Sequence, residues 1–228
     1  ETARGGILRS GLGFGRCDIG VITNIQEGHL GLSDIHTLDD LARVKSTVVK
    51  SIKKDGWAIL NGDDEQCIKI GENLHCNVAY FSMDEDSPFI KKQSKEGKIV
   101  AVYENGFITV KKGEWKIRVE RATHVPLTLG GKAKFMIANA LAATLASYLW
   151  GFKTEDISLS LQTFIPSVAQ TPGRMNIFDF KKFKVLIDFA HNPAGYEAIE
   201  DYLKNVEATK KIGIISGVGD RRDEDIKE

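Results

Sequence analysis

The alternation of apolar and polar positions predicts strands and helices in turn along the first part of the chain. Apolar runs rich in β-branched residues, each bounded by polar loops, predict buried strands at 17–25, 57–61 and 77–83. Between the first two, apolar residues recur at helical spacing over 38–53 and predict a helix, with Gly56 as the stop signal after it. Strand, helix and strand in this order predict a parallel sheet with right-handed connections.

The period changes to strict alternation between about residues 98 and 120. The dipeptides at 105–106 (Asn-Gly) and 112–113 (Lys-Gly) are hairpin-turn signals, so a small antiparallel sheet is expected here as an insert. An alanine-rich helix is then predicted over 132–151, and a shorter helix over 154–164.

A stretch of Pro, Ser, Gln, Thr and Gly over 166–174 predicts a boundary between two domains. Beyond it the pattern predicts a hairpin over 175–191, a helix that starts at Pro193 with Asn192 as its N-cap, and a strand over 211–220. These elements are the start of a second α/β unit.

The predicted fold class is therefore α/β. A parallel-sheet domain with the antiparallel insert is expected over 1–170, and a truncated second α/β domain over 171–228. The chain begins at Glu1 and ends directly after a strand-like segment, so we expect it to be part of a longer enzyme.

Charge and cysteine content narrow the class of function. The 31 Lys and Arg balance the 31 Asp and Glu over 228 residues, so the chain has no overall field that would attract nucleic acid or an acidic membrane, and we expect neither as partner. No apolar run reaches the roughly 18 residues of a membrane span, and no secretory leader is visible. Cys17, Cys67 and Cys76 lack CxxC spacing and predict reduced thiols in a cytoplasmic protein.

Lys45 is the most informative residue of the helix predicted over 38–53, which begins at a capping box formed by Thr37 and Asp40. It falls inside the apolar stripe of that helix, where an unpaired ammonium costs several kcal/mol. The lysine either snorkels out at the edge of the stripe or faces the ends of the neighbouring strands as a functional group. Both alternatives stay open on the sequence.

Polar side chains also follow the first two predicted strands. His29 comes after strand 17–25, and Asn61, Asp63 and Asp64 follow strand 57–61. Ligands of open α/β sheets bind at this carboxyl edge, and carboxylates with an imidazole suit Mg²⁺ beside a nucleotide. A lone loop histidine is more often a surface group.

The stretch VLIDFAHNPAG over 185–195 places Asp188, His191 and Asn192 where another strand ends. A capped turn from strand to helix explains them as well as a functional cluster does. The glycine-rich GLGFGR over 11–16 precedes a strand, whereas a phosphate loop or dinucleotide fingerprint follows one. A dinucleotide oxidoreductase is therefore remote.

Eight short segments occur in one order along nearly the whole chain: ETARGG, ITNIQEGHLGL, DIHTLDDLARVKS, LNGDD, NALAA, PGRMN, DFAHNPAG and GDRRDED. In that order they resemble the Mur ligase superfamily. The resemblance implies that residues 1–170 belong to the central, ATP-binding domain of such a ligase. Residues 171–228 would be the start of its Rossmann-like carboxyl-terminal domain.

Mur-type ligases join a carboxylate to an amine with ATP, through an acyl phosphate that the amine captures. The segments are most similar to those of a branch that extends an Asp/Arg polymer. The resemblance therefore implies a ligase that uses ATP and Mg²⁺ to add arginine to the side-chain carboxyl of an Asp-containing polymer, and that is a homo-oligomer at full length. It also implies that the family's phosphate-binding loop precedes residue 1, so this chain alone would be inactive.

Roles for individual residues follow from the same resemblance. Lys45 matches a lysine that is carbamylated in several Mur ligases and helps to bind a second metal. Asp188 and His191 would be catalytic in a cleft completed by domain closure, and would point into empty space in an open structure. Glu1 and His29 match family positions that bind Mg²⁺. The positions that match nucleotide-binding residues of the family are Asn139, Arg174 and Asn192.

Two departures from the family pattern are visible. Phe135 to Asn139 reads FMIAN where many members have His-Asn-Val-x-Asn, which removes the usual upstream adenine contact, and Phe189 stands where tyrosine is more usual. The alternatives are a peptidoglycan or folate polyglutamate ligase of the same chemistry, and a nucleotide-binding module without catalysis.

Overall fold

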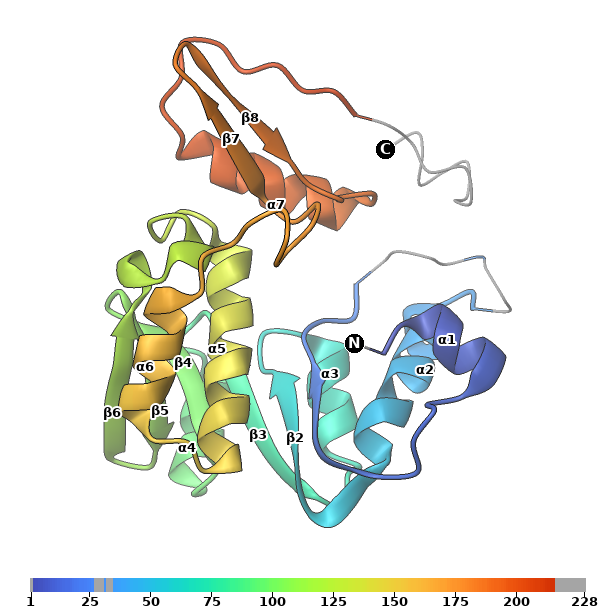
Figure 1. Ribbon diagram of the computed structural model, residues 1–228. Helices are drawn as coiled ribbons and strands as arrows, with labels where there is room; N and C mark the ends of the chain where they lie inside the picture. Colours follow the sequence, from blue (N-terminus) through green and yellow to red (C-terminus); the bar gives the residue numbers. More distant parts are fainter. Residues whose placement is uncertain (1, 27–30, 32–34, 216–228) are drawn as a thin grey trace.

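The computed structural model describes residues 2–26, 31 and 35–215, and its centre is a six-stranded sheet in the order β1-β2-β3-β4-β5-β6 (Figure 1). Strands β1 to β4 run parallel, and β5 and β6 continue the sheet antiparallel. The fold class predicted from the sequence is confirmed. The strand bounds are Cys17–Ile22 (β1), Ile52–Asn61 (β2), Asn77–Ser82 (β3), Val100–Glu104 (β4), Phe107–Lys112 (β5) and Trp115–Arg121 (β6).

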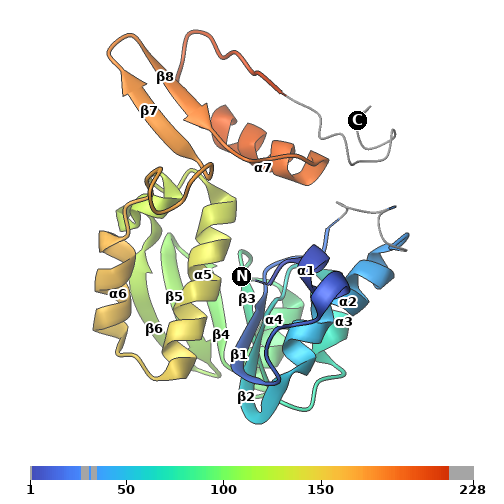
Figure 2. The same ribbon diagram turned by 45° about the vertical axis from the view of Figure 1, so that its right-hand side comes forward.

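Helices pack on both faces of this sheet, and the helix bounds are Arg4–Ser10 (α1), Leu38–Lys50 (α2), Glu65–Gly71 (α3), Pro88–Lys95 (α4), Lys134–Trp150 (α5) and Thr154–Thr163 (α6). Alternate residues of a buried strand enter different cores, because successive side chains of a strand point to opposite faces. Ala58 and Leu60 pack in the core with α2, α3 and α4, whereas Ile59 packs in the core with α5 and α6. The turned view shows the same two helical layers (Figure 2).

The antiparallel strands are not a separate inserted sheet. β4 pairs with β3 in parallel and with β5 antiparallel, so the insert lengthens the main sheet. The expected helix over 38–53 ends earlier, at Lys50, because β2 already begins at Ile52. Gly56 is therefore not a helix stop. It lies inside β2, where a Cβ atom would come within 2.3 Å of the backbone oxygen of Asp18.

The second unit contains a two-stranded antiparallel sheet and one helix, which confirms the predicted hairpin and helix. Their bounds are Asn176–Phe180 (β7), Phe183–Ile187 (β8) and Pro193–Lys204 (α7). Asn192 caps α7 as predicted, since its side-chain oxygen accepts a hydrogen bond from the Gly195 N–H at 2.8 Å.

The strand predicted over 211–220 is absent from its described part, residues 211–215. The isoleucines of this stretch are exposed, Ile214 by 98%. An apolar run becomes a strand only when a neighbouring strand takes up its backbone hydrogen bonds, and the sheet beside it has only β7 and β8 among the described residues. Residues 216–220 lie outside the described residues.

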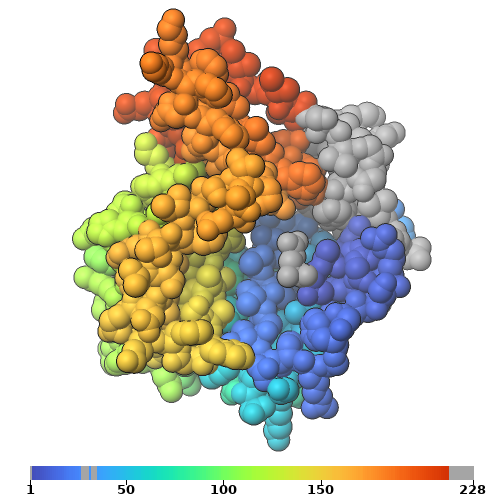
Figure 3. Space-filling view, viewed as in Figure 1, coloured from blue at the N-terminus to red at the C-terminus, as the bar shows by residue number. Residues whose placement is uncertain are grey.

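The second unit rests on the start of α5. Met136 and Tyr202 belong to one small buried cluster together with Met175, and Lys134 forms an ion pair with Asp201 at 3.2 Å. In the space-filling view the second unit, in orange and red, is a lobe above the sheet domain (Figure 3). Within the described residues, no helix combines the length and apolar character that crossing a membrane requires.

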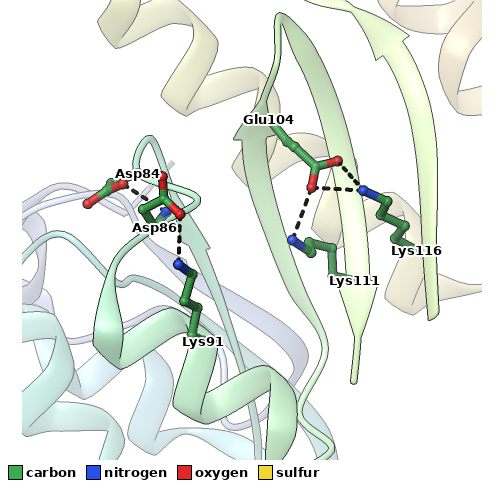
Figure 4. Close-up of polar contacts among 6 residues, drawn as sticks. All are labelled: Asp84, Asp86, Lys91, Glu104, Lys111 and Lys116. Atoms are coloured by element: carbon green, nitrogen blue, oxygen red, sulfur yellow. Dashed lines mark hydrogen bonds and ion pairs between the residues drawn. The ribbon is translucent and has the colours of Figure 1, made fainter. Parts of the chain in front are cut away.

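A buried carboxylate ties the antiparallel strands together. Glu104, only 3% exposed, accepts hydrogen bonds from the ammonium groups of Lys111 and Lys116, each at 3.1 Å (Figure 4). Burial works against ionisation of this carboxyl group, but the two lysines outweigh it and hold the pKa of Glu104 below its ordinary value.

We expect Glu104→Gln to lower the free energy of unfolding by about 1–2 kcal/mol at neutral pH, because two ammonium groups lose their carboxylate. The lowered pKa sets the sign of the pH dependence. The stabilisation by Glu104 is complete above the unfolded-state pKa and is lost as the pH falls through the folded-state pKa.

Urea unfolding of the parent chain and the variant at neutral and at strongly acidic pH measures this dependence. Glu114→Gln, at an exposed turn glutamate, is the control. If the parent and Glu104→Gln differ in free energy of unfolding as much in acid as at neutral pH, the ionised carboxylate is not the source of the stabilisation.

Candidate active site at the carboxyl ends of the parallel strands

Side chains from three neighbouring elements hold the loop that follows β1. Each of residues 23–25 makes one hydrogen bond to a different side chain: Asn61 Nδ2 donates to Thr23 O at 2.9 Å, Lys45 Nζ donates to Asn24 O at 3.0 Å, and Ile25 N donates to Asp64 Oδ2 at 2.6 Å. Asn61 is the last residue of β2, Asp64 is the N-cap of α3, and Lys45 lies on α2. The path of the loop toward residue 27 is thereby fixed at the carboxyl edge of the sheet.

The two aspartates after β2 are engaged with protein donors. Asp64 caps α3, since its Oδ1 accepts from Cys67 N at 2.9 Å, and its Oδ2 takes the amide of Ile25. Asp63 accepts from Ser82 Oγ and, at 2.7 Å, from the amide of Met83. Both carboxylates therefore connect loops at this edge rather than forming a ready metal shell.

The predicted metal ligands Glu1 and His29 lie outside the described residues. Within the described part of the chain, no group of at least three His, Cys, Asp or Glu side chains could hold a metal ion. The Mg²⁺ site therefore stays a prediction.

The ammonium of Lys45 lies just beyond the end of β1, a position that both interpretations drawn from the sequence allow. The side chain is half-buried, and this burial lowers the pKa of Lys45 below its ordinary value, only partly opposed by the neighbouring Cys67 and Asp64. Burial also raises the pKa of the Cys67 thiol to about 12. Lys45 is thus a cation at a site that disfavours its charge, and its functional role stays a prediction.

The second unit gathers another group of predicted site residues where β8 ends. Asp188 accepts hydrogen bonds from Met175 N at 2.9 Å and from Ala190 N at 2.8 Å. Our expectation that Asp188 points into empty space is therefore wrong, because both of its oxygens bind backbone amides. The carboxylate instead fixes the turn that carries Arg174 against the end of β8.

Arg174 and His191 both contact Phe189. The Arg174 guanidinium lies 5.2 Å from the centre of the Phe189 ring, a cation–π contact that orients an otherwise exposed side chain. His191 donates through Nδ1 to the Phe189 carbonyl at 2.8 Å, which leaves Nε2 as the proton acceptor in the neutral ring. The phenylalanine noted as a departure from the family pattern therefore serves as the platform for two predicted site residues.

Asn139 lies on an exposed face of α5, where its amide nitrogen contacts the sulfur of Met136 at 3.7 Å. Its hydrogen bonding within the described residues includes neither the Lys45 group nor the Arg174 group. The structure therefore brings Lys45 together with Asn61 and Asp64, and Arg174 with His191. Within the described residues, the hydrogen bond of Asn139 goes to Met136 and to neither group.

Two residues at the carboxyl edge of the parallel strands, Ser82 and Cys67, were not predicted from the sequence as part of the candidate site. Ser82 bridges Asp63 to the loop after β3, accepting from Asp84 N at 2.9 Å. The available signal was a serine one residue before the end of the strand predicted over 77–83, at the same carboxyl edge of the sheet. Cys67 carried no signal, since its nearness to Lys45 depends on how α3 packs against α2.

The fold and these residues define a class of protein. A family model for the Mur ligase middle domain matches residues 3–147. The chain belongs to the Mur ligase family, which confirms the resemblance drawn from the eight segments.

Curated relatives of the chain include cyanophycin synthetases. That of Trichormus variabilis is 50% identical over 225 residues, which are 99% of this chain and 25% of that protein. That of Synechocystis is 47% identical over 228 residues, 100% of this chain and 26% of that protein. A UDP-N-acetylmuramate–L-alanine ligase of Clostridium acetobutylicum is 29% identical over 199 residues, 84% of this chain and 38% of that protein. The chain thus spans about a quarter of the length of the cyanophycin synthetases.

Solved structures agree on the fold. MurF from Acinetobacter baumannii matches with a TM-score of 0.59 and 21% identity over 83% of this chain and 38% of that one. A murein peptide ligase from Psychrobacter arcticus matches with a TM-score of 0.53 and 18% identity over 88% of this chain and 40% of that one. At such identities these likenesses show the Mur ligase fold alone.

Proposed function

We propose that the chain is the Mur-ligase part of a longer, ATP-dependent amide ligase of the cyanophycin synthetase type. The reaction would attach arginine to the side-chain carboxyl of Asp in a polymer, through an acyl phosphate. The 50% identity to a cyanophycin synthetase over 99% of the chain is the observation that carries this proposal. The weaker identity of 29% to a muramate ligase favours it over cell-wall substrates.

The contacts of the second unit support a role in holding a phosphate group. The Arg174 guanidinium is oriented by the ring of Phe189, and the turn that carries Arg174 is fixed by Asp188. A planar guanidinium fork donates two hydrogen bonds to a phosphate at once, so a fixed orientation gives specificity as well as charge. Asp188 is in this proposal a positioning residue.

The first unit supplies the carboxyl edge of the sheet. ATP, when bound, supplies the phosphoryl group that activates the carboxylate. Lys45 lies at this edge as a half-buried cation beside the loop that leads to residue 29. The carboxylates of Asp63 and Asp64 bind protein donors, so we assign them to holding the loops at this edge.

The test is ATP-dependent phosphate release by the full-length enzyme. We expect release with an Asp-containing primer and arginine together, and none when either is omitted. UDP-muramoyl and folate substrates are assayed beside them. Release with only a muramoyl or folate substrate overturns the proposal in favour of another Mur-type ligase. ATP binding without release on any substrate favours the non-catalytic module.

A further inference from the structure

Strand β6 contains a β-bulge that determines where its charged side chains point. Its pairing with β5 shifts register at Val119, which is an extra residue with no partner on the opposite strand. Side chains of a regular strand alternate between faces, so Arg118 and Arg121, three positions apart, would otherwise point to opposite sides. The bulge places both on the same face of the sheet.

On the opposite face the bulge serves packing. Glu120 accepts hydrogen bonds from Ser158 Oγ at 2.6 Å and from the side chain of Gln162, both on α6. This contact fastens α6 to β6 and accounts for the position of Glu120. It does not account for the two arginines that the same bulge brings together on the other face of the sheet.

The two arginines share one aromatic ring. The guanidinium of Arg118 lies 4.9 Å and that of Arg121 lies 4.5 Å from the centre of the Phe107 ring. Both side chains are exposed, and in the described part of the chain neither forms an ion pair with a carboxylate. Two like charges held on one ring repel each other unless an anion lies between or over them.

The other two cations on this face of β5 and β6 are already neutralised in part. Lys111 and Lys116 point toward the single carboxylate of Glu104, as Figure 4 shows. Arg118 and Arg121 lie on the same face of β5 and β6, beyond that cluster. The free positive charge of this face is therefore concentrated in two planar guanidinium groups rather than spread over many lysines.

We propose that Arg118 and Arg121, seated on Phe107, form a docking site for the carboxylates of an acidic polypeptide. Each guanidinium fork matches one carboxylate through two parallel hydrogen bonds. An extended acidic peptide presents carboxylates on one side at every second residue, roughly 6.5–7 Å apart. Nucleic acid fits less well, because its affinity comes from many phosphate contacts and this site offers two guanidinium groups.

The experiment is fluorescence anisotropy of a labelled oligo-aspartate peptide with the 228-residue chain at low salt. The double variant Arg118→Ala/Arg121→Ala should bind the peptide about tenfold more weakly, since it loses two charge-assisted contacts. The matched control is Lys112→Ala/Lys153→Ala. It removes the same charge from exposed positions, one of them the last residue of β5. The control should bind like the parent chain.

Circular dichroism and thermal melting establish that both double variants stay folded, which is expected because all four side chains are exposed. Equal weakening in both double variants overturns the proposal, because net charge alone then explains the binding. Absence of peptide binding to the parent chain also overturns it. So does an oligonucleotide that binds more tightly and is lost in the arginine variant. The assay contains no ATP, so its outcome is independent of the ligase proposal.

Discussion

Replacing Lys45 by alanine is expected to lower the rate of ligation by the full-length enzyme by a factor of at least about 10², while the fold is retained. The ammonium of Lys45 lies beyond the end of β1, where it donates to Asn24 O at 3.0 Å. Burial disfavours its charge and lowers its pKa. Burying a charged ammonium costs free energy. Such a cost is typical of functional sites, where a ligand or a reacting group offsets it.

The size of the expected loss separates two roles. If Lys45 only anchored the loop at Asn24, its loss would leave one carbonyl to be hydrated and would cost about 1 kcal/mol of stability. If Lys45 also contacts the substrate or the groups transferred, phosphate release falls by orders of magnitude with little change in the melting temperature.

Two further variants sharpen this comparison. Lys45→Met keeps the aliphatic stem and its packing but has no donor, so it should be as inactive as the alanine variant. Lys50→Ala, at an exposed position of the same helix, should keep full activity. Full activity in Lys45→Ala would limit Lys45 to the anchoring role. The measurements are initial rates of ATP-dependent phosphate release and thermal melting of each variant.

The second large effect is on stability alone. Gly56→Ala is expected to lower the free energy of unfolding by about 3 kcal/mol or more. Its Cβ would come within 2.3 Å of the backbone oxygen of Asp18 and 2.6 Å of the side chain of Ile52. A flexible side chain can move away, but the backbone of β1 cannot move without breaking its ladder with β2.

Gly15→Ala is the matched control, because a Cβ at Gly15 has no atom within 4 Å and no positive φ. It should change the free energy of unfolding by less than about 0.5 kcal/mol. Urea unfolding of the 228-residue chain measures both variants. A Gly56→Ala variant as stable as the control would show that β1 and β2 are further apart than described.

Gly56 also illustrates what the sequence predicts well and what it does not. The capping box of Thr37 and the N-cap at Asn192 were predicted from local patterns, and the structure contains both. Local hydrogen bonds of this kind depend on residues three positions apart, so they are readable from the chain. The need for glycine at position 56 comes from β1, a distant segment, and local reading mistook it for a helix stop.

The same distinction explains the other differences in the fold. The short helices α3 and α4 were not predicted, because about two turns give no clear periodicity. The stretch 211–215 has a strand-like composition but pairs with no strand in the part of the chain that the structure describes. Strand formation is decided by the partner as much as by the residues themselves.

At the candidate site, the positions were more predictable than the contacts. The rule that ligands bind at the carboxyl edge of parallel strands correctly brought Lys45, Asn61 and Asp64 to one place. It did not reveal that Asp64 uses both oxygens on backbone amides, nor that Asp188 does the same in the second unit. These hydrogen bonds depend on which backbone amides the folded loops bring close to each carboxylate, and this cannot be predicted from the composition.

The extra residue in β6 also bears on how the outer edge of the sheet is protected against strand-to-strand pairing. In the described residues β6 is the last strand of its sheet, so its outer edge has backbone groups that a second chain could pair with. The bulge at Val119 interrupts the even spacing that such pairing needs, and Lys116 and Arg118 add charge along the same edge. A deletion of Val119 would therefore restore a regular, open strand edge, and with it a template for aggregation.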